Sequence, residues 1–242
     1  MNYGLQMYSL RDITEQDMEG ALKEAAAMGY SFVEFAGFMG RSAGEIKAML
    51  DKYGLRASGT HTGLAALTDD VLEETIRYHQ EIGCADIIIP YEKFATKADI
   101  DGFVERVAVL TPRLKEAGIR LHYHNHDHEF KPNEDGQIPM DEIVSRTDIL
   151  LEIDTFWVFA AGKDPVETIT ALKDRIRVIH LKDGMEDGEG KSLGLGRAPV
   201  LKVRETARKF GFEMVVESEG LEPTGLEEVK RCIDFLKEQD AK

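Results

Sequence analysis

Short runs of β-branched and aromatic residues alternate with amphipathic stretches along the whole chain. The runs have the composition of buried strands and cover residues 4–9, 32–36, 57–62, 86–91, 120–125, 150–155, 177–181 and 213–217. Between them, apolar residues recur at three- and four-residue spacing, as in "DDVLEETIRYHQEIG" and "GLEEVKRCIDFLKEQ". This spacing predicts helices with one buried face.

Glycines mark the end of most helical stretches. Five of them directly precede a predicted strand: Gly29, Gly54, Gly83, Gly118 and Gly211. Each fits the left-handed position just past a helix C-terminus. Eight alternating units with no linker between them predict an α/β protein with a single domain, residues 1–242, folded as one (β/α)8 TIM barrel. A doubly wound sheet is the alternative, but it usually needs a Gly-rich turn after its first strand, and "YSLRD" has none.

Composition and charge limit the kinds of binding partner that can be expected. The chain has 242 residues and a formal net charge of -15. Nucleic acid is disfavoured as a partner, because binding it needs a basic face. The N-terminal "MNYGLQMYSLRD" lacks the pattern of a signal peptide, and no apolar run has the length of a membrane span. With only Cys84 and Cys232, which fit helical patterns as small hydrophobes, a cytoplasmic location without membrane contact is expected.

Side-chain alternation predicts polar groups inside the barrel, at the C-terminal ends of the strands. In "LLEIDTFW", Leu151 and Ile153 would face the helices, so Asp154 faces inward. The same alternation turns these residues inward: Gln6, Glu34, His61, His122, His124, His180, Lys182 and Glu217. Each of them alone is more often structural than functional. Together they converge on one barrel mouth, which is costly unless the groups are paired or bind an ion.

The inward set suits a divalent cation. Asp154, His180 and Glu217 come from three consecutive strands, and a fourth acidic ligand from the preceding strand would complete the shell. Such oxygen-rich ligation favours Mn²⁺ or Mg²⁺, with Co²⁺ and Zn²⁺ as alternatives. The ion could stabilise an enediolate while a carboxylate moves the proton next to a sugar carbonyl. No Ser-His-Asp or Cys-His arrangement is legible.

The ordered motifs "HNH…E", "EIDTFW", "HLKD" and "VVESEG" resemble the xylose-isomerase-like TIM-barrel superfamily of sugar isomerases and epimerases. That group includes the ketose 3-epimerases, the inosose dehydratases and the endonuclease IV barrels, and the resemblance covers essentially the whole chain. It implies a metal held by an acid after strand five and by the Asp, His and Glu of the next three strands, here Asp154, His180 and Glu217.

The fifth strand departs from the commonest family pattern. Many relatives carry a Glu-Asn-His triplet where this chain has His124-Asn125-His126. By analogy with the inosose dehydratases, Glu129 is expected as the fourth ligand, with His124 or His126 facing the substrate. Direct ligation by His124 is the alternative. His122 is expected to have a core role below the site.

Two further departures bear on the substrate. Trp157 stands where ketose 3-epimerases have His, and would give a sugar ring an apolar face. Lys182 is the nearest inward cation where the epimerase pattern has Arg. Both argue against a free ketohexose. The loop "GMEDGEGKSLGLGR" is long enough to act as a mobile lid.

We therefore expect a metal-dependent isomerase or epimerase of a small sugar or sugar derivative, with one divalent ion, Mn²⁺ first. Glu129 and Glu217 are expected on opposite faces of the substrate as acid and base, with His124 or His61 moving protons between oxygens. Contacts to substrate are expected from Gln6, Glu34, His61, His126, Trp157 and Lys182. A lyase of the same fold, a dehydratase or a 3-keto-glycoside-cleaving enzyme, is the alternative, because the His-rich fifth strand could protonate a leaving oxygen.

Two other classes are less favoured by the sequence. An endonuclease IV-like DNA repair enzyme would need a basic footprint, which the net charge of -15 opposes. A non-catalytic barrel would leave the convergent polar residues unexplained. A homo-oligomer is compatible with the sequence, which determines neither the substrate nor the oligomeric state.

Overall fold

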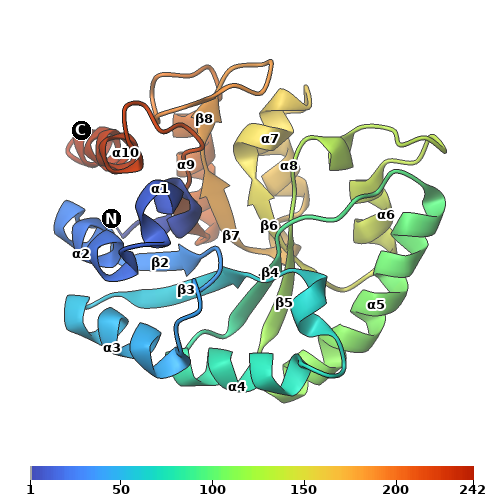
Figure 1. Cartoon of the computed structure of the whole chain (residues 1–242). Coiled ribbons are helices and arrows are strands. Elements are labelled where there is room, and N and C mark those ends of the chain that lie inside the picture. Colours follow the sequence, from blue (N-terminus) through green and yellow to red (C-terminus); the bar gives the residue numbers. More distant parts are fainter. Residues whose placement is uncertain (1) are drawn as a thin grey trace.

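The computed structural model describes residues 2–242 and contains a closed barrel of parallel strands (Figure 1). The barrel strands are β1 (Gly4–Gln6), β2 (Phe32–Phe35), β3 (Arg56–His61), β4 (Asp86–Ile89), β5 (Arg120–His124), β6 (Leu150–Asp154), β7 (Ile176–Leu181) and β10 (Glu213–Val216). They close in the order β1-β10-β7-β6-β5-β4-β3-β2. The predicted (β/α)8 TIM barrel is confirmed.

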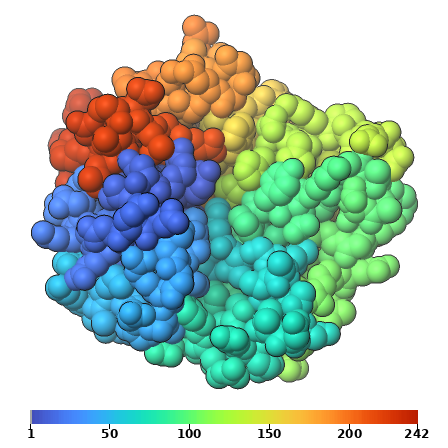
Figure 2. Space-filling view, viewed as in Figure 1, coloured from blue at the N-terminus to red at the C-terminus, as the bar shows by residue number. Residues whose placement is uncertain are grey.

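Helices surround the barrel. They are α1 (Arg11–Thr14), α2 (Met18–Met28), α3 (Ala43–Tyr53), α4 (Leu72–Ile82), α5 (Lys97–Glu116), α6 (Pro139–Arg146), α7 (Thr155–Ala160), α8 (Pro165–Ala171), α9 (Val200–Phe210) and α10 (Gly225–Asp240). Short 3-10 turns are η1 (Met7–Leu10), η2 (Leu64–Leu67), η3 (His128–Phe130) and η4 (Lys173–Arg175). The blue N-terminal and red C-terminal segments lie side by side, where α10 contacts α1 and α2 (Figure 2).

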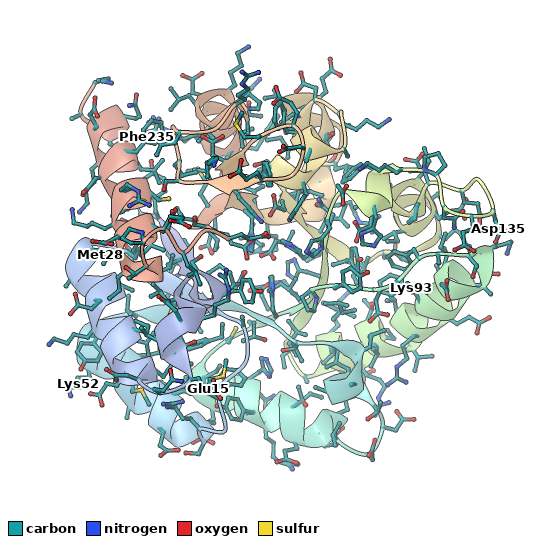
Figure 3. The ribbon with its side chains drawn as sticks, turned by 45° about the horizontal axis from the view of Figure 1, so that its top comes forward. Glu15, Met28, Lys52, Lys93, Asp135 and Phe235 are labelled. Carbon is teal, nitrogen blue, oxygen red and sulfur yellow. The ribbon has the colours of Figure 1, made fainter. Side chains whose placement is uncertain are left out.

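Charged side chains such as Lys52 and Asp135 project from the outer edge of the molecule (Figure 3). Within residues 2–242, no helix combines the length and apolar character needed to cross a bilayer.

The first strand is shorter than expected. It ends at Gln6 rather than at residue 9, because Met7–Leu10 turns into η1. The Gln6 side chain caps that turn by accepting a hydrogen bond from the Tyr8 N–H. The glycine prediction holds: Gly29, Gly54, Gly83 and Gly211 cap helices with positive φ angles, and Gly118 has a φ of 78° one residue past the C-cap of α5.

The barrel interior is layered. Phe32, Val178 and Val215 form a small apolar cluster inside it. In the strand register, Gly4 pairs with both Phe32 and Val215. A Cβ on Gly4 would lie 2.1 Å from the Phe32 ring, so only glycine leaves room for this plug. Two residues further along their strands, in the same orientation, come the polar side chains of Glu34, His180 and Glu217.

The segment after β7 forms a hairpin of β8 (Asp183–Gly184) and β9 (Gly190–Lys191). The Asp183 carboxylate accepts hydrogen bonds from the backbone N–H groups of Gly184, Gly194, Gly196 and Ala198. The loop in which we expected a mobile lid is therefore organised by one buried carboxylate.

Candidate active site

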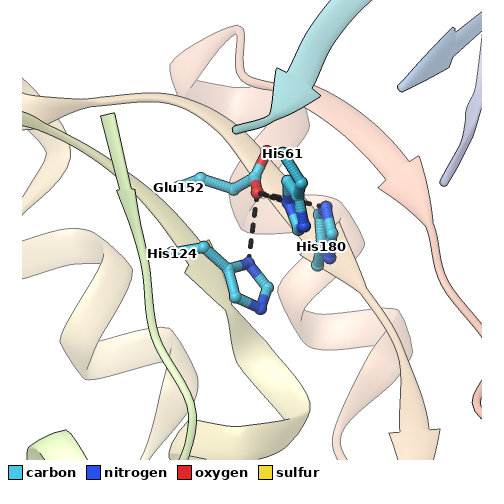
Figure 4. A group of neighbouring side chains, drawn as sticks. All are labelled: His61, His124, Glu152 and His180. Carbon is cyan, nitrogen blue, oxygen red and sulfur yellow. Dashed lines mark hydrogen bonds and ion pairs between the residues drawn. The ribbon is translucent and has the colours of Figure 1, made fainter. Parts of the chain in front are cut away.

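Four side chains meet inside the barrel near the C-terminal ends of the strands (Figure 4). This inner cluster consists of His61 on β3, His124 on β5, Glu152 on β6 and His180 on β7. Glu152 Oε2 lies 2.8 Å from His61 Nε2, 3.1 Å from His124 Nδ1 and 3.3 Å from His180 Nε2. One carboxylate thus ties three imidazoles together.

The sequence interpretation missed Glu152. It precedes Asp154 by two residues, so strand alternation places both on the same face. In the structure Glu152 pairs in register with Val178, and Asp154 with His180. The alternation that selected Asp154 would therefore also have selected Glu152.

A second group, which we call the ligand group, shares two histidines with the inner cluster. It consists of His124, Asp154, His180 and Glu217, whose donor atoms lie within 4.8 Å of one another. Asp154 Oδ1 caps α7 by accepting hydrogen bonds from the backbone N–H groups of Phe156 and Trp157. Asp154 Oδ2 is buried and has no hydrogen-bond partner within residues 2–242, so it remains available to a cation.

His124, and not the expected Glu129, is the side chain that lies with Asp154, His180 and Glu217 in the ligand group. Glu129 Oε1 accepts a hydrogen bond from the Tyr123 hydroxyl at 2.5 Å, and Oε2 accepts one from the His126 N–H at 2.8 Å. Tyr123 is an outward residue of β5, and η3 carries Glu129 to that side of the strand. The structure thus differs from the expectation that Glu129 joins Asp154 and Glu217, because these bonds hold its carboxylate away from the ligand group.

Gln6 and Glu34 lie behind the ligand group. Gln6 Nε2 donates to Glu34 Oε1 at 2.7 Å, and the same oxygen lies 2.7 Å from His180 Nε2. Both residues are fully buried. They were expected to contact substrate; in the structure Glu34 bonds to Gln6 and pairs with His180 and His61, and neither Gln6 nor Glu34 lines the cavity described below.

Lys182 faces inward but is surrounded by protein acceptors. Its Nζ lies 3.6 Å from Asp154 Oδ2 and 3.4 Å from Glu217 Oε2, and it also pairs with Glu219. The ammonium lies 4.7 Å from the centre of the Trp157 ring. The fully buried side chain was expected to bind substrate, but it faces three carboxylates instead.

Burial and neighbouring charges shift the pKa values of the carboxyl groups in opposite directions. Burial, reinforced by Glu34, raises the pKa of Glu152 to about 8. Burial also raises the pKa of Asp154 to about 6, against the effect of Lys182. For Glu217, burial is outweighed by Lys182 and His180, and the pKa is lowered.

The pKa values of the histidines are also shifted in opposite directions. Burial would lower the pKa of His61, but its hydrogen bonds to Glu152 and Glu34 raise it to about 9. The pKa of His180 is raised well above its usual value, because Glu152 and Glu34 outweigh burial. Burial and the neighbouring His180 lower the pKa of His124, and burial with Lys182 lowers that of His126 to about 4.

A cavity of about 640 Å³ opens above these groups. Its lining consists of Tyr8, Ala36, Gly37, His61, Pro90, Tyr91, His124, His126, Trp157, Glu217 and Glu219. His126 Nδ1 and Trp157 Nε1 are buried and have no hydrogen-bond partner in the described part of the chain. Both residues line the cavity, although these two atoms are themselves buried beneath its surface. Tyr8 and Tyr91 fall within the predicted strands 4–9 and 86–91 but lie beyond the observed ends of β1 and β4, and Glu219 lies on a loop after β10; none of the three was expected at the site.

The residues fit a divalent cation. Glu34, Glu152, Asp154 and Glu217 are buried carboxyl groups, and Lys182 is the buried ammonium beside two of them. Buried carboxylates are costly unless cations pair with them, and Lys182, His61 and His180 do so here. Asp154 Oδ2, which accepts no hydrogen bond among the described residues, and the two-imidazole, two-carboxylate donor set both suit a metal.

A closed parallel barrel with ionisable groups at the C-terminal strand ends belongs to the class of TIM barrels that place their sites there. Residues 22–239 match the model of the family described as xylose isomerase-like TIM barrel, and the chain belongs to that family. The resemblance drawn from the motifs is confirmed.

Three known proteins are similar to this chain in sequence or in structure. A sugar phosphate isomerase/epimerase from Parabacteroides distasonis ATCC 8503 has 25% sequence identity and a TM-score of 0.85, with 97% of each chain covered. Inosose dehydratase from Geobacillus kaustophilus (strain HTA426) is 25% identical over 193 residues, which span 69% of this chain but only 62% of the dehydratase. An L-ribulose 3-epimerase structure shares the fold, with a TM-score of 0.74, 15% identity, and 98% and 94% of the two chains covered.

Proposed function

We propose that this protein is a divalent-metal-dependent isomerase or epimerase of a sugar or sugar derivative. The observation that carries the proposal is the buried ligand group, whose donor atoms lie within 4.8 Å of one another, at the base of a polar and aromatic cavity. The names of the relatives, a sugar phosphate isomerase/epimerase and an inosose dehydratase, support a polyhydroxylated substrate.

His124, Asp154, His180 and Glu217 would hold the metal, with His124 in place of Glu129. A second imidazole in place of a carboxylate moves the preference away from Mg²⁺ and towards Mn²⁺, Co²⁺ or Zn²⁺. When bound, such an ion would polarise a substrate carbonyl and make the neighbouring C–H more acidic.

The side chains of the cavity can act on both faces of a bound substrate. Around the barrel, β10 is three strands from β5 through β7 and β6, and three strands from β3 through β1 and β2. Glu217, which follows β10, therefore faces His61 and His126 across the mouth. We assign Glu217 to removing the proton next to the carbonyl, and a histidine across the cavity to returning a proton on the other face.

Substrate hydroxyls would be held by polar side chains that line the cavity. His126 and Glu219 are such side chains, and the Trp157 ring offers the flat apolar surface that a sugar face needs. Lys182 and Glu34 would act indirectly, by fixing Glu217 and His180.

A lyase is the second candidate, and the two histidines on the cavity wall that lie outside the ligand group, His61 and His126, favour it. After the same proton removal, His61, whose pKa is raised to about 9, could protonate an oxygen leaving from the β-position, which gives an unsaturated product. Product analysis separates the reactions: an unchanged formula with solvent deuterium at carbon means isomerase, and loss of water or an aglycone means lyase.

Metal content and hydrogen exchange test the proposal together. Purified protein should bind a stoichiometric divalent ion and should exchange deuterium into a member of a panel of keto-sugars and keto-glycosides. His124→Ala should lose the ion, whereas Glu129→Gln should retain it. Full metal content in both Asp154→Ala and Glu217→Ala would overturn the ligand assignment, and retention by His124→Ala with loss by Glu129→Gln would restore Glu129.

A further inference from the structure

A second groove adjoins the proposed catalytic cavity. It has a volume of about 580 Å³, and Gly37 and His61 line both hollows. The groove runs between the β2–α3 loop on one side and η2 with α4 on the other. A ligand seated beside His61 could therefore extend into it.

The walls of this groove are mainly apolar. The Phe38 ring, from the β2–α3 loop, packs on the Tyr78 ring of α4, with ring centres 4.3 Å apart and planes at 33°. Ala65, Ala66 and Val71 contribute small side chains to the lining. Together they leave room for a flat apolar group against an aromatic surface.

The inner polar side chains of the groove are already bonded to protein. The Tyr78 hydroxyl donates to the Arg41 carbonyl at 2.8 Å, and the Thr75 hydroxyl donates to the Ala66 carbonyl at 2.7 Å. His79 uses both ring nitrogens, on Thr60 Oγ1 and on the Thr75 carbonyl. Apart from the exposed carboxylate of Glu74, the groove thus offers few spare hydrogen bonds, in contrast to the main cavity, which is lined by three histidines and two glutamates.

From this contrast we propose that the substrate is a glycoside whose sugar lies in the main cavity and whose aromatic aglycone lies in the Phe38–Tyr78 groove. This inference rests on the proposed sugar-directed function and names its substrate class. A second sugar ring is a poorer occupant, because its hydroxyl groups would lose water without gaining partners. An aromatic ring would gain from burial and from stacking on Phe38 or Tyr78.

Paired ligands test the groove. The probes are the methyl and 4-nitrophenyl glycosides of whichever keto-sugar exchanges deuterium, and of glucose if none does, with Kd measured by calorimetry. The 4-nitrophenyl glycoside should bind about tenfold more tightly than its methyl partner, because only the ring reaches the groove.

A groove-filling variant supplies the control. Ala65 is exposed at the groove, so Ala65→Trp should remove the 4-nitrophenyl advantage while leaving methyl glycoside binding and the thermal unfolding midpoint unchanged. Ala98→Trp, at an exposed position on α5, should change neither affinity. Equal affinities for the two glycosides, or an advantage that survives Ala65→Trp, would overturn the inference. Absence of exchange with every keto-sugar would count against the proposed function instead, and the glucoside pair would still test the groove.

Discussion

Asp183 is the residue whose replacement should most clearly expose how the loop over the site is held. Asp183 is buried, with only 1% of its surface exposed to solvent. Oδ1 accepts from Gly184 N at 2.8 Å and Ala198 N at 3.1 Å, and Oδ2 accepts from Gly194 N at 2.9 Å and Gly196 N at 3.1 Å. Asp183→Asn keeps one acceptor oxygen and points an NH₂ group at two N–H donors.

The variant therefore loses two charge-assisted hydrogen bonds, worth about 1.5–3 kcal/mol each, or about 3–6 kcal/mol together. Three of the four N–H groups are partly buried, and water can reach them, so the lower half of that range, about 3–4 kcal/mol, is expected. At about 2–4 °C per kcal/mol for a chain of this size, the unfolding midpoint should fall by roughly 6–16 °C.

Urea and thermal unfolding measure the change, and fluorescence locates it. The chain has a single tryptophan, Trp157, and a Cβ on Gly188 of the hairpin would lie 3.5 Å from its ring. The emission of folded Asp183→Asn should therefore shift as the hairpin loosens. Asp187→Asn is the matched control, since that exposed carboxylate accepts one N–H, from Glu189, and should change stability by about 0.5 kcal/mol. A loss below about 1 kcal/mol for Asp183→Asn would refute the reasoning.

Other predictions concern the barrel and the metal. Burial alone would raise the pKa of Asp86, but His122 and Arg120 outweigh burial, and the net pKa is lowered. The ionised Asp86 therefore stabilises the folded protein above about pH 4, and this stabilisation is lost as the pH falls. Asp86→Asn should thus be less stable at pH 7 and have a shallower acid limb; an unchanged slope would contradict this. Gly4→Ala should cost about 1–3 kcal/mol in urea unfolding by clashing with Phe32, whereas Gly102→Ala in α5, with open space around it, should be neutral or stabilising by about 0.5–1 kcal/mol. Adding the preferred divalent ion at 100 times its Kd should stabilise the wild type by about 2.7 kcal/mol, and a similar gain in Asp154→Ala would count against the proposed site.

Much of the fold could be read from the sequence because its signals are local. Residue composition and spacing located all eight barrel strands to within a few residues, and the glycines Gly29, Gly54, Gly83 and Gly211 marked helix ends. Strand ends were less well defined, as at Gln6, where a side-chain cap starts a 3-10 turn. Such a bond depends on one rotamer, which hydrophobic spacing does not report.

In the candidate site, too, the sequence predicted local properties, and the tertiary structure decided how distant residues meet. Alternation along a strand is a local property, so the sequence alone turned His124, Asp154, His180 and Glu217 towards the barrel axis and favoured a cation there. Their convergence within 4.8 Å was decided by the closure and register of the barrel, which bring strands far apart in the chain together.

What only the tertiary structure decided is how each inward or loop residue is used. The turn of η3 bonds Glu129 to Tyr123 on the outer side of β5, while Glu152 collects three histidines that lie on other strands. Neither outcome follows from alternation, because both depend on hydrogen bonds between segments whose relative positions are fixed only when the barrel closes. The sequence determined which chemical groups reach the mouth, and the closed barrel determined which of them meet.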